Sequence, residues 1–213
     1  MRINKIVVTL VVVAALCALF FIAMTYSKKE IRNLNSTGKN IICFGDSVTY
    51  GYGVNLGEDY PTALAKLVNR KVINAGVDGD TSLDGLKRIK SDVLDKKPYL
   101  VLIEFTGNDF IKKIPIDLTI ANIKEMILLA QAQGSIVAIV DVSAGLFLRD
   151  YRVRLDKLAR ETGAIFVPAV LNKILTNPSM KSDFMHPNVA GYKIVAQRVY
   201  SAIAPYLGKR GQN

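Results

Sequence analysis

The chain contains one histidine, His186, and the residues around it suit a role in proton transfer. Asp183 precedes His186 by three positions, so its carboxylate can reach the imidazole within one turn of the chain. A carboxylate in that place can hold Nδ1–H and leave Nε2 free to accept a proton from a nucleophile. The following Pro187 and Asn188 are typical of the start of a helix. The alternative is a loop histidine that makes only local hydrogen bonds.

Ser47 is the candidate nucleophile, in a Gly-Asp-Ser-Val-Thr stretch that follows an apolar segment. The same stretch could be an ordinary turn and helix N-cap. Neither the phosphate-binding pattern Gly-x-x-x-x-Gly-Lys-Ser/Thr nor the nucleophile elbow Gly-x-Ser-x-Gly occurs here, since Thr49 takes the last position of the elbow. A serine nucleophile needs hydrogen-bond donors for an oxyanion, and the Ser47 N–H, the Gly76 N–H and the Asn108 side chain are the candidates. Gly76 could instead begin a helix, and Asn108 could be a turn residue.

Strand-like apolar segments alternate with helical patterns from residue 40 onward and predict how these side chains are positioned. The predicted strands are 40–44, 71–74, 99–105, 135–142 and 164–168, and the predicted helices are 60–69, 81–94, 118–133, 147–162 and 188–207. Residues 99–103 and 136–140 are apolar without alternation, which is typical of parallel strands buried on both faces. The pattern predicts a three-layer α/β/α sandwich with a five-stranded parallel sheet, whose working surface lies beyond the carboxyl ends of the strands.

The N-terminal part of the chain differs in composition from the rest. Residues 6–24 are apolar apart from Thr9. As a helix they would span roughly 28 Å, close to a bilayer core of about 30 Å, whereas a signal peptide has an apolar region of about 7–15 residues. We therefore expect residues 1–26 to be a membrane anchor, with a cleaved signal as the alternative, residues 27–39 a linker and residues 40–213 the catalytic domain. A single anchor before one domain favours an extracytoplasmic domain, although more basic residues follow the run than precede it.

Charge and cysteine content narrow the classes of partner. The net charge is +10, and the part after residue 26 carries +8 because Arg2 and Lys5 precede it. A basic surface of this kind is compatible with simple solvation or with contact to anionic lipid headgroups, and no motif in the sequence indicates a nucleic-acid partner. One histidine and two cysteines exclude a disulfide scaffold and the usual zinc sites, so we expect neither a metal nor a cofactor.

Over residues 40–207 the sequence resembles the SGNH, or GDSL, hydrolases. The matching blocks, in order, are Gly45-Asp46-Ser47, the segment with Gly76, Gly107-Asn108-Asp109 and Asp183-Phe184-Met185-His186. The stretches at 60–61, 74–81 and 186–192 are similar to the bacterial arylesterase/lysophospholipase branch, which includes acyl-thioesterases. Residues 142–148, after the fourth predicted strand, lack the Asn-Tyr-Gly type of sequence expected of the thioesterase members.

The resemblance implies a flavodoxin-like sheet of order 2-1-3-4-5. It also implies Ser47 as nucleophile, His186 as base and Asp183 as the acid that orients it. The oxyanion donors that it implies are Ser47, Gly76 and Asn108.

We therefore expect a carboxylic ester hydrolase that acts through an acyl-enzyme on lysophospholipids, aryl esters or short-to-medium acyl esters. Apolar residues that could line an acyl groove, each of which could equally be ordinary loop packing, are Leu56, Phe110, Ile111, Phe184 and Met185. A second enzyme hypothesis is O-deacetylation of a cell-envelope polysaccharide. A third hypothesis, a catalytically silent membrane-tethered binding domain, is disfavoured by the intact set of Ser47, Asp183 and His186.

Overall fold

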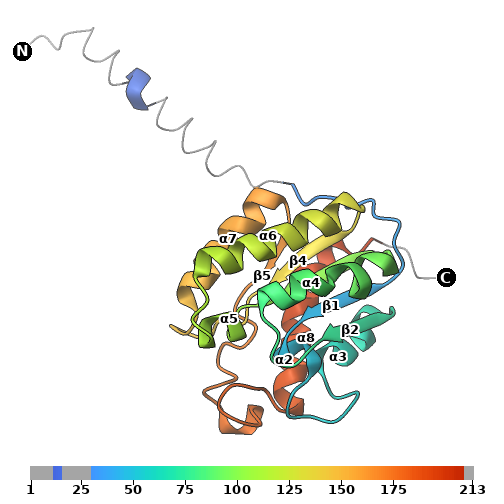
Figure 1. Cartoon of the computed structure of the whole chain (residues 1–213), viewed down its shortest axis with the longest axis vertical. Coiled ribbons are helices and arrows are strands. Elements are labelled where there is room, and N and C mark those ends of the chain that lie inside the picture. Colours follow the sequence, from blue (N-terminus) through green and yellow to red (C-terminus); the bar gives the residue numbers. More distant parts are fainter. Residues whose placement is uncertain (1–11, 16–29, 209–213) are drawn as a thin grey trace, which may run out of the picture. The chain divides into compact units, whose positions relative to one another are not determined.

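A computed structural model of the chain describes residues 12–15, which are helical, and residues 30–208 (Figure 1). Most of the predicted membrane anchor lies outside these described residues. Within them, no helix has both the length and the apolar character needed to cross a bilayer. The compact unit begins at Ile31, and the Asn33 side chain in the predicted linker donates hydrogen bonds to the backbone carbonyls of Gln131 and Ser135.

Five parallel strands form one sheet in the order β2-β1-β3-β4-β5, which confirms the predicted fold and strand order. The strands are β1 (Ile41–Gly45), β2 (Val72–Gly76), β3 (Leu100–Glu104), β4 (Ile136–Val140) and β5 (Ile165–Val167). In the register of the sheet, Gly45 at the end of β1 pairs with Gly76 of β2 and Glu104 of β3. The polar segments that follow these three strands therefore meet at one edge of the sheet.

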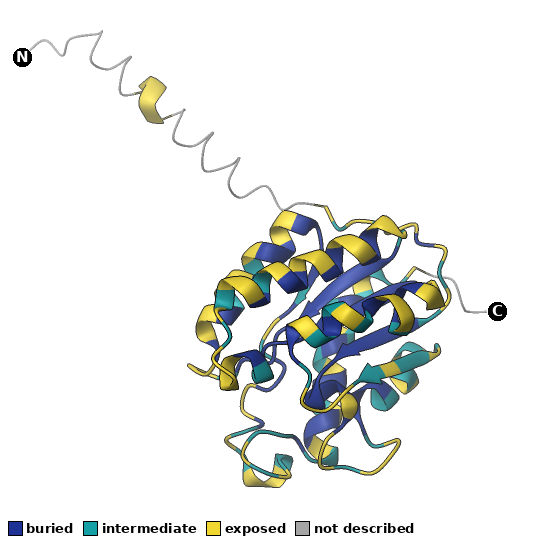
Figure 2. Cartoon of the chain, in the orientation of Figure 1, coloured by how far each residue is buried: buried dark blue, intermediate teal, exposed yellow. Residues whose placement is uncertain are grey.

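Side chains along the strands alternate between two apolar layers. Ile41 and Cys43 belong to the layer under α3 and α8, while Ile42 and Phe44 belong to the layer under α4, α6 and α7. These helices are α3 (Tyr60–Val68), α4 (Ser82–Asp92), α6 (Ile116–Ala132), α7 (Arg149–Thr162) and α8 (Val189–Ile203). Figure 2 shows the buried central strands between the helices. Burial on both faces explains why β1, β3 and β4 carry uninterrupted apolar runs.

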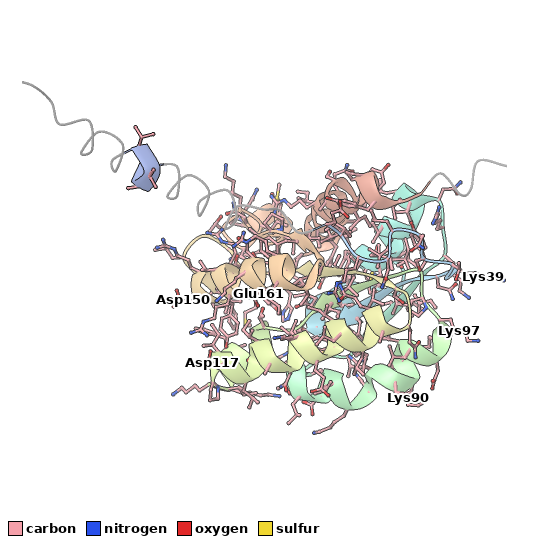
Figure 3. The ribbon with its side chains drawn as sticks, turned by 90° about the horizontal axis from the view of Figure 1, so that it is seen from above. Lys39, Lys90, Lys97, Asp117, Asp150 and Glu161 are labelled. Atoms are coloured by element: carbon pink, nitrogen blue, oxygen red, sulfur yellow. The ribbon has the colours of Figure 1, made fainter. Side chains whose placement is uncertain are left out.

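Charged side chains lie on the outside of the helical layers. Seen from above, Lys39, Lys90 and Lys97 lie on one side of the domain, and Asp117 and Asp150 lie on the other (Figure 3). Lys90 is exposed and pairs with Asp95 at 2.7 Å. All five of these side chains are exposed to solvent.

Local capping explains where the helices begin and end. Asp59 caps α3, which has Pro61 in its first turn, and Thr81 forms a capping box with Asp84 at the start of α4. Gly163 ends α7 in the left-handed conformation, with φ of 69°. Each predicted strand and most helix ends lie within two residues of the observed ones, although α8 ends at Ile203 and continues as a short 3₁₀ turn, Ala204–Tyr206.

The sequence patterns miss the shortest helical segments. These are α2 (Ser47–Tyr50), α5 (Gly107–Ile111) and the 3₁₀ turns Leu94–Lys96 and Pro178–Met180. Segments of three to five residues are too short to show a helical period. Two of them, α2 and α5, follow β1 and β3 and carry Ser47 and Asn108, so they set the geometry of the candidate site.

Candidate active site

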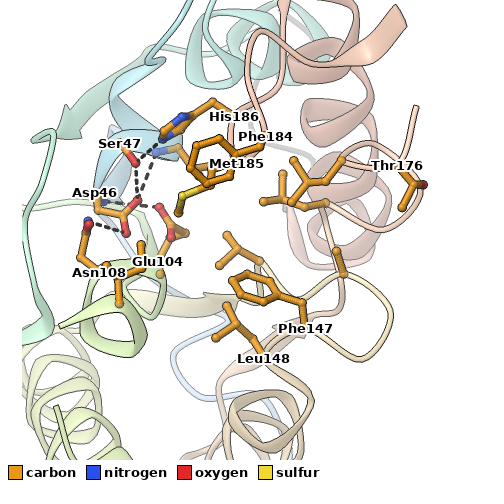
Figure 4. Close-up of a pocket in the computed structure, with 17 residues that line it drawn as sticks. Asp46, Ser47, Glu104, Asn108, Phe147, Leu148, Thr176, Phe184, Met185 and His186 are labelled. Carbon is orange, nitrogen blue, oxygen red and sulfur yellow. Dashed lines mark hydrogen bonds between the residues drawn. The ribbon is translucent and has the colours of Figure 1, made fainter. Parts of the chain in front are cut away.

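Ser47, His186 and Asp183 form one chain of hydrogen bonds at the carboxyl edge of the sheet. Ser47 is the first residue of α2, directly after β1, and its Oγ lies 3.0 Å from His186 Nε2. His186 Nδ1 lies 2.8 Å from Asp183 Oδ2. Figure 4 shows the His186 ring directed at the Ser47 side chain. The structure thus brings together the three side chains that the sequence proposes, in the order that nucleophilic catalysis requires.

A tight turn holds Asp183 in place. Its Oδ1 accepts hydrogen bonds from the backbone N–H of Met185 at 2.7 Å and of His186 at 2.8 Å. Burial by itself raises the pKa of Asp183, but the hydrogen bonds from the His186 ring and from these N–H groups outweigh burial, so the pKa lies below its ordinary value. Asp183 therefore stays ionised and can stabilise a positively charged imidazole.

Helix α8 fixes the loop that carries His186. Asn188 caps this helix, and its backbone N–H donates to Met180 O at 3.0 Å, which closes the loop. The buried Tyr192 of α8 donates its hydroxyl to Tyr52 O at 3.0 Å. The Tyr52 ring in turn lies 4.5 Å, centroid to centroid, from the His186 ring. The imidazole is therefore positioned by its own loop and by contact with the Tyr52 ring.

Two buried carboxyl groups next to the nucleophile were not predicted as site residues. The Asp46 side chain accepts a hydrogen bond from Val48 N at 3.1 Å and caps α2, and it accepts another from Asn108 Nδ2 at 3.3 Å. Glu104 Oε2 accepts from the Thr49 hydroxyl at 2.9 Å and from Asp46 N at 3.4 Å. The sequence signal for Glu104 is a single carboxyl at the end of an otherwise apolar strand.

Burial changes the protonation of this pair. It raises the pKa of Asp46 to about 6 and, together with the charge of Asp46, raises the pKa of Glu104 well above its ordinary value. Burial and the neighbouring carboxylate both favour the protonated form of Glu104, because two carboxylates in one buried place repel each other. Its Oε1 has no hydrogen-bond partner among the residues that the structure describes.

Two of the predicted oxyanion donors, Asn108 Nδ2 and Gly76 N, make hydrogen bonds within the protein. Asn108 Nδ2 lies at the start of α5 and also donates to Asp80 O at 3.0 Å. The Gly76 N–H is already donated to Asn74 Oδ1 at 2.9 Å. A Cβ at Gly76 would lie 2.1 Å from Tyr50 N, so glycine is needed here for the close approach of α2. The residue has a packing role, and its N–H is engaged away from the nucleophile.

The turn that follows β2 offers another backbone donor. In this turn Val77 N donates to Gly45 O at 3.0 Å and Asp80 N to Val77 O at 3.3 Å. The N–H groups of Asp78 and Gly79 have no protein acceptor in the described part of the chain. Gly79 lies in this turn with φ of 81°. The next residue, Asp80, accepts a hydrogen bond from Asn108 through its backbone carbonyl, so the Gly79 N–H belongs to the segment that is bound to Asn108. A glycine between two aspartates in the Asp-Gly-Asp stretch is the sequence signal for this turn.

An apolar cavity of about 460 Å³ opens at the nucleophile. Three of the residues predicted for an acyl groove line it: Ile111, Phe184 and Met185. The sequence prediction missed the lining residues Val142, Ala144, Phe147, Leu148, Leu171 and Leu175. Figure 4 shows Phe147 and Leu148 across the cavity from the catalytic residues. Residues 142–148 follow β4, so their position at the same sheet edge as Ser47 is the signal that could have identified them.

Two of the predicted groove residues lie elsewhere. Leu56 is fully exposed, in the turn that Asn55 and Glu58 close by hydrogen bonding. Phe110 packs edge-on against Phe147, with ring centroids 5.3 Å apart, and does not line the cavity. Consecutive residues of the α5 turn point in different directions, which is why Ile111 lines the cavity and Phe110 does not.

A serine, a histidine and a carboxylate in this order over a parallel α/β sheet define a serine hydrolase. Comparison with known proteins agrees: residues 43–194 match the GDSL-like Lipase/Acylhydrolase family. The chain belongs to this family and is a carboxylic ester hydrolase.

Named relatives support this assignment, and a solved structure supports the fold. The arylesterase of Vibrio mimicus is 25% identical over 188 residues, which cover 81% of this chain and 92% of the relative. Thioesterase 1/protease 1/lysophospholipase L1 of Escherichia coli is 24% identical, covering 78% of this chain and 84% of the relative. The crystal structure of TesA superposes with a TM-score of 0.75 at 24% identity, covering 79% of this chain and all of that one, and so supports the fold.

Proposed function

We propose that the chain hydrolyses esters of medium-length or longer acyl chains through an acyl-enzyme on Ser47. Ser47 Oγ attacks the carbonyl carbon while His186 Nε2 takes its proton, and the Asp183 carboxylate stabilises the imidazolium. His186 then gives the proton to the leaving alkoxide as the ester bond breaks. Water then hydrolyses the acyl-enzyme in the same way. His186 takes a proton from the water, the water oxygen attacks the acyl carbon, and Ser47 recovers a proton from His186 as its bond to the acyl group breaks.

The negative charge on the carbonyl oxygen needs donors that point at it in the tetrahedral intermediate. We assign Asn108 Nδ2, the N–H of Ser47 and, in place of Gly76, the N–H of Gly79. Ser47 begins α2, so its N–H has no acceptor four residues earlier in that helix. The Asn108 amide carries two N–H groups: the one that donates to Asp80 O at 3.0 Å orients the amide before substrate arrives, and the one 3.3 Å from Asp46 Oδ2 must turn from that carboxylate to the oxyanion.

The apolar cavity is the single observation that carries the choice of substrate. Its walls beyond the nucleophile are aliphatic and aromatic side chains, which an acyl chain would cover and an acetyl group would leave empty. Each buried methylene contributes about 0.8 kcal/mol, or roughly a fourfold gain in kcat/KM. This favours lysophospholipid or aryl esters of longer acids over polysaccharide O-acetyl groups.

A series of p-nitrophenyl esters from acetate to palmitate tests the proposal. We expect kcat/KM to rise with chain length until the cavity is filled, and Ser47→Ala to lower it by roughly 10³ or more at every length. Ala144→Leu, which narrows the cavity, should shift the optimum to shorter chains. The matched variant Leu146→Ala, at an exposed neighbour outside the cavity lining, should not. Highest activity on acetate, unchanged by Ala144→Leu, would favour the deacetylase instead.

We also propose that the N-terminal segment anchors this enzyme to a membrane, with the catalytic domain on the extracytoplasmic side. The apolar run at residues 6–24 supports the anchor. A single anchor ahead of one whole domain supports export of that domain.

A further inference from the structure

Arg88 of α4 has its guanidinium largely buried between the sheet and the turn after β2. Its side chain is 17% exposed, and its carbon Cζ lies 4.4 Å from the centre of the Phe44 ring. Nε binds Asp80 Oδ2 at 2.6 Å, Nη2 binds Gly45 O at 3.0 Å, and Nη1 binds both Ala75 O at 2.8 Å and Asp92 Oδ2 at 3.0 Å. The planar fork of arginine is required to reach all of these acceptors at once.

Apart from Asp92, which lies on α4 itself, the acceptors that Arg88 binds belong to the two strands and the turn that frame the nucleophile. Gly45 O lies at the end of β1, one residue before Asp46, and also accepts the N–H of Val77. Ala75 O lies at the end of β2, where the turn begins, and Asp80 lies where the turn ends. The backbone carbonyl of that same Asp80 accepts a hydrogen bond from Asn108 Nδ2.

We propose that Arg88 is a positioning residue for the oxyanion side of the active site. It fixes both ends of the turn at residues 76–80 against β1, and through Asp80 O it fixes the amide of Asn108. This inference rests on the proposed function, because it assumes that Asn108 and the turn stabilise the oxyanion. A lysine at this position would keep the charge but bind one or two of the acceptors, so the turn and the Asn108 amide would lose their common support.

Ion pairing along α4 does not by itself require the Arg88 guanidinium to point toward the sheet. Asp92, four residues away on the same helix, would by itself give Arg88 an ion pair, as Asp84, three residues away, gives Lys87 on the exposed face. The guanidinium instead points inward and binds two backbone carbonyls at the ends of β1 and β2. Small displacements of catalytic groups by such distant changes cost up to about 10² in rate.

Steady-state kinetics of Arg88→Lys on a p-nitrophenyl ester test the inference. We expect kcat to fall about 10–10²-fold with KM little changed, because the oxyanion carries charge only in the tetrahedral intermediate. Lys87→Met, next to Arg88 but exposed, is the matched control and should keep wild-type kcat. A variant with wild-type kcat at position 88 would overturn the proposal.

A double-mutant cycle separates positioning from stability. Asn108→Ala alone should lower kcat about 10²–10³-fold, and adding Arg88→Lys to it should lower kcat little further if Arg88 acts through Asn108. Multiplicative losses would overturn the inference. If Arg88→Lys fails to fold, Asp80→Asn weakens the other end of the same contact and should show the same non-additivity. An inactive wild type, or an active Ser47→Ala variant, would instead reject the proposed function itself.

Discussion

Single residues in the site are held in protonation states that depend on their burial. Asp46 is 2% exposed, and burial raises its pKa from 3.8 to about 6. The folded state therefore binds a proton between about pH 4 and pH 6 that the unfolded chain releases. This proton stabilises the fold fully below the unfolded pKa, and its contribution is lost as the pH rises through about 6.

The pH dependence of stability tests this state of Asp46. A shift of about two pKa units corresponds to about 3 kcal/mol in the free energy of unfolding. Asp46→Asn removes the titrating group, so from pH 4 to pH 7 the wild type should lose most of that stability relative to the variant. Urea unfolding at several pH values measures the difference, with the exposed Asp78→Asn as control. A difference that does not change with pH would show that Asp46 is already ionised at pH 4.

At the scale of elements, the position of the short helix α2 depends on the strand β2 against which it packs. Gly76 of β2 supports its backbone, and a Cβ there would lie 2.1 Å from Tyr50 N and 2.5 Å from the Thr49 carbonyl carbon. Backbone atoms cannot move aside as a flexible side chain would. The edge strand β2 therefore determines how close the nucleophile helix can lie to the sheet.

Gly76→Ala should move α2 and with it Ser47. We expect a loss of about 1–3 kcal/mol in the free energy of unfolding, typical of overpacking, together with a lower kcat. Gly208→Ala, where a new Cβ would meet nothing closer than 3.7 Å, is the control and should leave both unchanged. Thermal unfolding and ester hydrolysis on the same preparation measure the two effects. Unaltered stability would contradict the close packing of α2 on β2.

At the scale of the whole molecule, the compact unit begins at Ile31, at the edge of the sheet opposite to the catalytic site. Arg32 N donates to Gly163 O, just after α7, and Asn33 Nδ2 donates to Ser135 O, just before β4. Ser47 and the cavity lie beyond the carboxyl ends of the strands. Arg32 and Asn33 thus lie remote from the catalytic residues.

Removal of residues 1–29 should therefore leave kcat on short, soluble esters unchanged. The full-length chain should sediment with membranes and resist extraction by alkaline carbonate, whereas the shortened chain should not. Loss of ester hydrolysis on truncation would show that the N-terminal segment supports the site. Recovery of the native chain in the soluble fraction, with an N-terminus near Thr25 or Tyr26, would identify a cleaved signal.

Local signals in the sequence were sufficient to predict the strands, the long helices and part of the site. Doubly buried strands read as apolar runs, and capping residues such as Asp59 and Asn188 mark helix starts, because these signals act over a few neighbouring residues. Asp183 and His186 could be paired for the same reason, since one turn of the chain joins them. The single histidine left no competing base for Ser47.

Contacts between distant segments decided the rest. Ser47 and His186 are 139 positions apart, and only the closing of the sheet and α8 brings their atoms within hydrogen-bonding distance. Three features of the site depend on what packs against each residue. They are the glycine N–H that stays available, the choice between Phe110 and Ile111 as a cavity wall, and the shift in the pKa of Asp46. The sequence by itself determined which residues could react. Tertiary packing determined which donors, walls and charges surround them, because burial and hydrogen-bond partners come from segments far apart in the chain.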